Sequence, residues 1–306
     1  MTIELSLKIV GAALWLALAA LMALEVESPS WIVLLLLFSP LVLMPISRRL
    51  IETPVQARKR ERSTLAAAVL LGLSFCWLPA PSTAVLAVPW LIIRLLAASD
   101  AWLDWRKNAS FEPTHLCLLA ARVFPAIGAA WLLVHRANWT PLGFDPLIVL
   151  LTGAHFHHAG FTLPLIASLQ ARRIADGRSR FACLLILIGV PMVAVGITST
   201  HFGFLAWVEP VGVCLLVLGS LIVAWLQLCL AMQKNQALAP RLLLAASGLA
   251  LLVAMSLALG FGLRYLFPSL ALSMPHMWAY HGSLNVFGFG LCGLLGWRIL
   301  EHRQSR

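Results

Sequence analysis

Long apolar stretches, separated by short polar loops, run through the whole chain. Ten of them approach the length of about 20 residues that a helix needs to cross a bilayer. They lie at residues 6–24, 31–47, 64–80, 83–99, 114–135, 146–169, 181–203, 207–232, 241–266 and 276–299. Because Pro79 and Pro81 separate the third from the fourth, these two could form one re-entrant pair. The pattern predicts an all-α, polytopic membrane protein with nine or ten transmembrane helices.

The composition agrees with this prediction and narrows the class of protein. Of the 306 residues, 61% are hydrophobic and 11% charged, against about 25% charged in a soluble domain. No stretch is polar enough for a separate soluble domain. We therefore expect residues 1–306 to form a single transmembrane domain. Residues 1–113 would hold the N-terminal helices and a cytoplasmic amphipathic segment, and residues 114–306 the histidine-bearing helices.

Charge predicts the orientation in the membrane. The net charge is +10, and basic residues follow every even-numbered apolar segment. The positive-inside rule then places both termini of a multi-pass membrane protein in the cytoplasm. Because the basic residues lie in short loops without interleaved aromatic residues, we expect contact with membrane lipid and no nucleic acid. The sequence implies no protein partner.

Several polar positions need an interpretation of their own. Asp100–Glu112 is expected to be a short amphipathic helix on the cytoplasmic surface, with Trp102 and Trp105 at headgroup level. Arg94 could snorkel toward the cytoplasm. Arg122 lies deeper in its apolar segment and is expected to have a partner that the sequence does not identify.

The sixth segment carries three of the nine histidines, within Thr152-Gly-Ala-His-Phe-His-His-Ala-Gly-Phe-Thr162. Ionisable side chains at membrane depth are costly and usually mark a site. His155 and His158 are three residues apart and share a helix face, which Thr152 and Thr162 extend. His157 points about 100° away from His158, and a helix-to-helix hydrogen bond is its simplest interpretation. Pro164 is expected to kink the helix.

The last segment carries a second polar stripe. His281, Asn285, Gly288 and Cys292 recur at helical spacing, and Tyr280 flanks His281. The predicted topology places this histidine in the outer half of the membrane with His155 and His158. Three further polar residues are expected at the same level, namely His201, Glu209 and Arg264. Small residues such as Gly288 commonly serve close helix packing, so the stripe also has a purely structural interpretation.

At these residues the sequence resembles the YndJ-like family of bacterial membrane proteins. The matching pieces are His155-Phe-His-His-Ala-Gly-Phe161 and His281-Gly-Ser-Leu-Asn285 with Gly288-Phe289, so the resemblance begins at about the sixth segment. It implies a multi-pass protein of the bacterial inner (plasma) membrane and supplies little mechanism. More remotely, the His-x-His and His-Gly pieces are similar to helices of haem-copper oxidase core subunits. That similarity covers a handful of residues and is an analogy only.

Three classes of function remain open. The first is a membrane-embedded enzyme that uses His155, His158 and His281 for acid/base chemistry on a lipophilic small molecule, in an isomerisation or cyclisation. Thr152, Thr162, His201, Glu209, Arg264, Tyr280 and Asn285 would then contact the substrate. The second is a small-molecule or proton-coupled transporter. The third is a haem- or metal-binding protein. The sequence requires no cofactor and assigns no metal ligand, and motifs of zinc proteases and of serine hydrolases are absent.

Overall fold

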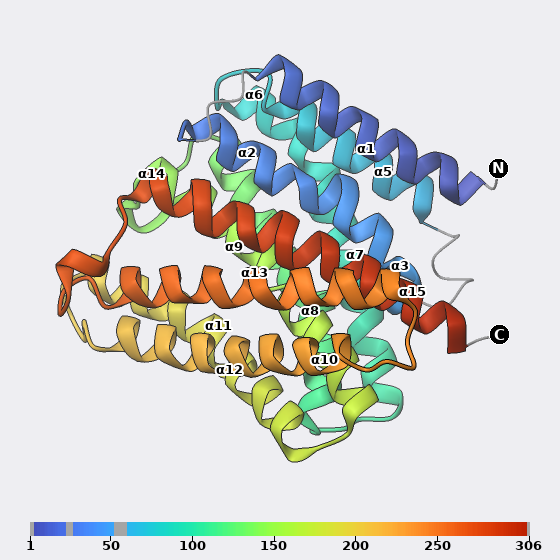
Figure 1. The fold of residues 1–306 in the computed structure, drawn as a ribbon. Helices are drawn as coiled ribbons and strands as arrows, with labels where there is room; N and C mark the ends of the chain where they lie inside the picture. The colour runs from blue at the N-terminus through green and yellow to red at the C-terminus, as the bar shows by residue number, and fades with distance from the viewer. Residues whose placement is uncertain (1–2, 23–26, 52–59, 305–306) are drawn as a thin grey trace. The chain divides into compact units, whose positions relative to one another are not determined.

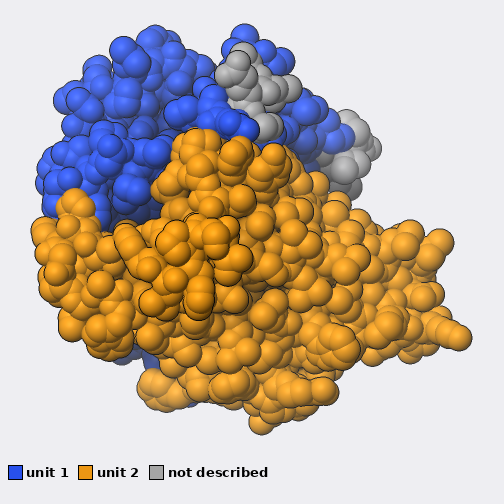
Figure 2. Space-filling model, turned by 60° about the vertical axis from the view of Figure 1, so that its left-hand side comes forward, with its two compact units in different colours: residues 1–109, 122–161 blue, residues 110–121, 162–306 orange. Residues whose placement is uncertain are grey.

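The computed structural model describes residues 3–22, 27–51 and 60–304, and every regular element in these ranges is helical (Figure 1). The chain divides into two compact units, coloured separately in Figure 2. Unit 1 comprises residues 1–109 and 122–161, and unit 2 comprises residues 110–121 and 162–306. That residues 1–306 act as a single transmembrane domain stays a prediction.

Unit 1 holds the N-terminal helices and the helix that carries three histidines. Its elements are α1 (Ile3–Leu21), α2 (Pro29–Phe38), the π-helix η1 (Ser39–Leu43), α3 (Met44–Ile51), α5 (Glu61–Ser74), α6 (Pro81–Ala84), the 3-10 turn η2 (Val85–Ala87), α7 (Val88–Lys107), the later part of α8 (Pro113–Arg136), the 3-10 turn η3 (Pro141–Gly143) and α9 (Pro146–His158). Helix α9 packs on α2 and η1, and α5 packs on α1 and α7.

Unit 2 holds the first turns of α8 and the rest of the chain. Its elements are α10 (Thr162–Ile174), α11 (Gly177–His201), α12 (Val208–Ala231), α13 (Leu238–Gly262), the 3-10 turn η4 (Pro268–Leu270), α14 (Met274–His276), the π-helices η5 (Met277–Gly282) and η6 (Leu284–Leu291), and α15 (Cys292–Gln304). Helices α11, α12 and α13 lie side by side and antiparallel (Figure 1). Helix α10 packs on α11 and α12, and η6 and α15 pack on α13.

The prediction of a polytopic helical membrane protein is confirmed. Among the described residues, seven helices are long and apolar enough to cross a membrane. They are Pro29–Ile51, Pro81–Lys107, Pro113–Arg136, Gly177–His201, Val208–Ala231, Leu238–Gly262 and Met274–His302. Each overlaps one of the ten predicted segments.

Several of these helices present large apolar side chains on their outer surfaces, as helices in contact with lipid do. On α11 these are Phe181, Leu184, Ile188, Val195 and Ile197, and on α12 they are Val211, Leu218 and Trp225. All but Ile197 follow one another at three, four or seven residues, so they gather on one face of each helix. Such stripes would be an aggregation hazard in water, and a bilayer covers them.

Three predicted segments correspond to shorter helices. The first predicted segment corresponds to the apolar helix Lys8–Leu21. The third predicted segment corresponds to α5, which has 14 residues. The sixth is interrupted: α9 ends at His158 and α10 begins at Thr162. Pro164 is the third residue of α10 and cannot donate a backbone hydrogen bond to the carbonyl of Gly160, which favours the interruption just before it.

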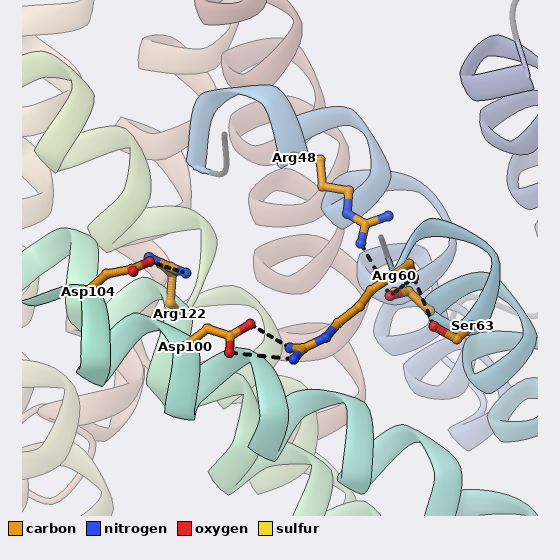
Figure 3. A network of polar contacts seen from close by, with 7 residues as sticks. Arg48, Arg60, Ser63, Asp100, Asp104 and Arg122 are labelled. Carbon is orange, nitrogen blue, oxygen red and sulfur yellow. Dashed lines mark hydrogen bonds and ion pairs between the residues drawn. The ribbon is translucent and has the colours of Figure 1, made fainter. Parts of the chain in front are cut away.

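The segment after residue 100 is not a separate amphipathic helix, because α7 continues without a break to Lys107. The segment has no proline or glycine before Lys107 that would end the helix. Its two aspartates form ion pairs within unit 1 (Figure 3): Asp100 lies 2.6 Å from Arg60, and Asp104 lies 3.4 Å from Arg122. Asp104 is therefore the partner that the sequence predicted for Arg122 without identifying it.

Candidate functional site

The predicted site residues divide between the two units. Thr152, His155 and His158 lie on α9 in unit 1. The others lie in unit 2, namely Thr162, His201, Glu209, Arg264, Tyr280, His281 and Asn285. That His155 and His158 line one pocket with His281 stays a prediction.

His157 is the most completely buried of the three histidines on α9, with no exposed surface. Its Nε2 lies 3.0 Å from the indole Nε1 of Trp90 on α7, and its Nδ1 lies 2.7 Å from the carbonyl oxygen of Gly153. An indole N–H can only donate and a carbonyl can only accept. The ring is therefore neutral, with its proton on Nδ1 and both nitrogens in use. The predicted helix-to-helix hydrogen bond of His157 is confirmed.

Close packing holds this imidazole in place. A Cβ atom on Gly128 of α8 would lie 2.6 Å from Nδ1 of His157, and a Cβ atom on Gly153 would lie 2.5 Å from Cδ2 of Leu132. Real Cβ atoms essentially never approach other atoms so closely. The two glycines let α8 and α9 approach as small residues commonly do in membranes.

The π-helix η1 supplies the hydrogen bonds that end α9. Pro40 has no N–H to donate, and the N–H of Ser39 bonds to the carbonyl of Leu36. The carbonyl of Leu35, which an uninterrupted α-helix would pair with Ser39, lies 2.9 Å from Nε2 of His158. The hydroxyl of Ser39 in turn donates to the carbonyl of His157 at 2.9 Å. A local irregularity in one helix therefore fixes the end of another.

His158 differs from His157 in the state of its second nitrogen. Since the carbonyl of Leu35 can only accept, Nε2 of His158 carries a proton and donates it. In the neutral ring, Nδ1 is then an acceptor. This atom is buried and has no hydrogen-bond partner among the described residues. A buried acceptor without a partner costs about 1–3 kcal/mol, so this nitrogen is a feature of α9 that the fold itself does not explain.

The remaining candidates on α9 are less distinctive. The hydroxyl of Thr152 donates to the carbonyl of Ile148 at 2.7 Å, one turn back on the same helix. The ring of His155 lies edge-on to that of Phe156, with centroids 5.9 Å apart. His155 is partly exposed.

In unit 2, His281 connects η5 to α13. Its Nδ1 lies 2.8 Å from the carbonyl of Ala254, so this nitrogen carries the proton and donates. Its Nε2 lies 3.2 Å from the amide nitrogen of Asn285, and that amide also donates to the carbonyl of His281 at 2.8 Å. Further along the helix, a Cβ atom on Gly288 would lie 2.3 Å from that of Ala250. The polar stripe thus faces α13, as its structural interpretation expects.

The other candidates in unit 2 lie in different surroundings. Glu209 is buried and pairs with Arg264 at 2.6 Å, and the Arg264 guanidinium lies 4.5 Å from the ring centre of Tyr265. His201 and Tyr280 are exposed. Thr162 is buried, and its hydroxyl has no hydrogen-bond partner among the described residues.

Two groups of polar residues were not predicted. Trp90 and Ser39 position the histidines, and in the sequence each is one more residue of an apolar run. Unit 2 also contains a buried network, in which Gln227 donates to Ser247 at 2.9 Å and accepts from the indole of Trp297 at 3.2 Å. In the sequence, Gln227 itself could have indicated this network, because a side-chain amide in the middle of an apolar segment needs hydrogen-bond partners.

A metal site has little support in these arrangements. Within the described ranges, no group of three or more His, Cys, Asp or Glu side chains is placed to hold a metal ion. The carbonyl partners of His158 and His281 also differ from the ligand sets of transition metals.

Comparisons with known proteins identify the family. The sequence model of the family described as YndJ-like protein matches residues 34–289, so the similarity extends well before the sixth segment, where the resemblance in the sequence began. The protein named "Uncharacterized membrane protein YndJ" of Bacillus subtilis (strain 168) is 25% identical over 215 residues. These cover 70% of this chain and 38% of that relative, and no solved structure matches. The chain belongs to the YndJ-like family of membrane proteins.

Proposed function

We propose that the protein is an enzyme of the bacterial inner membrane, with both termini in the cytoplasm, that uses histidine acid/base chemistry on a lipophilic small molecule. The reaction class that fits is an isomerisation or cyclisation, in which a proton is removed from one atom of the substrate and returned to another. The observation that carries the proposal is the bare, buried Nδ1 of His158. A neutral imidazole nitrogen of this kind is a general base.

Burial works against a charged His158 ring, and two features of its surroundings offset part of that cost. A proton taken up on Nδ1 leaves an imidazolium whose Nε2–H still points at the carbonyl of Leu35, and a charged donor strengthens that hydrogen bond. His158 is also the last residue of α9, where the helix dipole favours positive charge. Both effects would stabilise the state that follows proton abstraction.

The other residues take supporting roles in this proposal. His155 lies one turn before His158, and His281 would serve as a second acid/base group through Nε2. The contacts with substrate assigned to Thr152, Thr162, His201, Glu209, Arg264, Tyr280 and Asn285 remain part of the proposal. Among them the hydroxyl of Thr162 has the strongest support, because it is buried and lacks a partner among the described residues.

A transporter is the second candidate, and one observation favours it. The chain leaves its helical path between α9 and α10, directly after His158. Interrupted helices with ionisable residues at the break are typical of the binding sites of secondary transporters. The haem- or metal-binding alternative has no comparable support.

The substitution His158→Gln tests the enzyme against the transporter. A glutamine amide can still donate to the carbonyl of Leu35, and it removes the base. We expect an unchanged thermal midpoint in detergent and a loss of turnover of about 10²–10⁴-fold, the usual contribution of a general base. The measurement is mass spectrometry of membrane lipid extracts from a host that lacks its own copy and expresses either version.

The two candidates differ in what this comparison shows. For an enzyme, one lipophilic compound accumulates and another disappears in the His158→Gln strain. For a transporter, every compound keeps its chemical identity and only its distribution across inverted membrane vesicles changes. The control is His115→Gln on an exposed residue. Extracts and vesicles indistinguishable from wild type would remove His158 from the site.

A further inference from the structure

A buried arginine ends α8 in unit 1. Arg136 is the last residue of this helix, and its surface is only 2% exposed. In the ranges that the structure describes, no aspartate or glutamate forms an ion pair with its guanidinium. Arg264 in unit 2 shows the usual arrangement, a cation paired with the carboxylate of Glu209 at 2.6 Å. A buried charge is costly unless it is paired, so the charge of Arg136 needs an explanation.

The contacts of Arg136 hold the chain between α5 and α6 and use only part of the guanidinium. Its Nη2 donates to the carbonyl of Trp77 at 2.7 Å and to the hydroxyl of Thr83 at 3.2 Å. Its guanidinium carbon lies 4.9 Å from the ring centre of Phe75. None of these partners carries a charge, and the end of α8 adds only the partial negative charge of a helix dipole. The positive charge is therefore not neutralised by these contacts.

Two buried nitrogens at this place have no hydrogen-bond partner among the described residues. They are Nε of Arg136 and Nδ1 of His135, the residue before it. Both side chains pack on Phe75, since the imidazole of His135 stacks on that ring with the centroids 6.0 Å apart. The Nε of an arginine always carries a hydrogen and can only donate. A buried donor without a partner indicates a bound acceptor, and an anion at Nε would also neutralise the charge.

The donor that remains selects the kind of anion. A carboxylate or phosphate commonly binds a guanidinium through two parallel N–H bonds from neighbouring nitrogens. Both such pairs of nitrogens include Nη2, and in Arg136 this atom already donates to Trp77 and Thr83. The Nε–H alone suits an anion that accepts through a single atom. We propose that Arg136 binds a small monatomic anion such as chloride, which accepts the Nε hydrogen and neutralises the buried charge.

The test is the stabilisation of the purified protein by chloride. The thermal midpoint is followed in detergent while sodium chloride replaces sodium gluconate at constant ionic strength. Wild type should become more stable as chloride rises, with the logarithmic dependence of a ligand that binds only the folded state. Arg136→Gln should need at least about tenfold more chloride for the same shift, because a hydrogen bond to a charged group contributes that factor or more.

Arg106→Gln is the matched control, because Arg106 is an exposed arginine of the same unit, and it should respond as wild type does. If Arg136→Gln does not accumulate, wild-type crystals grown in sodium bromide decide: anomalous scattering should place a bromide next to Nε of Arg136, and no peak there rejects the site. Equal midpoints in chloride and gluconate, a response to sodium acetate and none to chloride, or equal weakening in Arg106→Gln would overturn the proposal.

Discussion

Replacing His157 with alanine should be among the most damaging single changes in unit 1. The change leaves the buried indole N–H of Trp90 without an acceptor and opens a cavity where α7, α8 and α9 meet. The unpaired donor and the cavity together predict a loss of about 3–5 kcal/mol. The measurement is the thermal midpoint of the purified protein in detergent, with the amount of folded protein in membranes as a second readout.

The partner of His157 allows a stricter form of this test. Trp90→Phe removes the donor and leaves the Nε2 acceptor unpaired, so the two changes should be strongly non-additive in a double-mutant cycle. His158→Gln serves as the comparison, because it keeps a donor for Leu35 and should cost little. A His157→Ala protein as stable as wild type would show that this histidine does not hold the helices together.

The substitution Gly196→Ala should have the corresponding effect in unit 2. A Cβ atom at Gly196 of α11 would lie 2.4 Å from Cα and 2.6 Å from the backbone nitrogen of Glu209 on α12. Because the obstructing atoms are backbone, α11 and α12 must separate, and we expect a loss of about 1–3 kcal/mol or more. The shift also disturbs Glu209, which is paired with Arg264. Thermal unfolding in detergent measures the loss.

Gly177 provides the control on the same helix. A Cβ atom there meets nothing within 4 Å, so Gly177→Ala should be neutral or stabilising by up to about 1 kcal/mol. Equal midpoints for the two alanine variants would mean that α11 and α12 do not approach as closely as the structure places them.

The sequence was sufficient to predict the helices of unit 2 closely. The predicted segment 207–232 corresponds to α12 at Val208–Ala231, and 181–203 corresponds to α11 at Gly177–His201. Such helices are set by long apolar runs that end in polar residues. The interruption between α9 and α10 was harder to predict from the sequence. The apolar run continues through Gly160, and the decisive feature is the backbone N–H that Pro164 lacks.

The candidate site was predictable only in part. The histidines are visible because imidazoles are rare in apolar segments, and the spacing correctly separated His157 from His158. The different roles of His157 and His158 depend on hydrogen-bond partners that the pattern of residues in the sequence does not reveal. His158 bonds to a backbone carbonyl that η1 leaves available, and the ring of His157 bonds to an indole 67 positions away. The π-helices themselves have no reliable sequence signature.

The central claim is that His157 is structural and His158 keeps a bare acceptor. Solid-state ¹⁵N NMR of histidine-labelled protein in bilayers at neutral pH measures this directly, with His157→Ala and His158→Gln assigning the signals. We predict a neutral His157 protonated on Nδ1 and a neutral His158 protonated on Nε2, its Nδ1 at the shift of an imidazole nitrogen without a hydrogen bond. A His158 ring protonated on Nδ1, or on both nitrogens, would contradict the account.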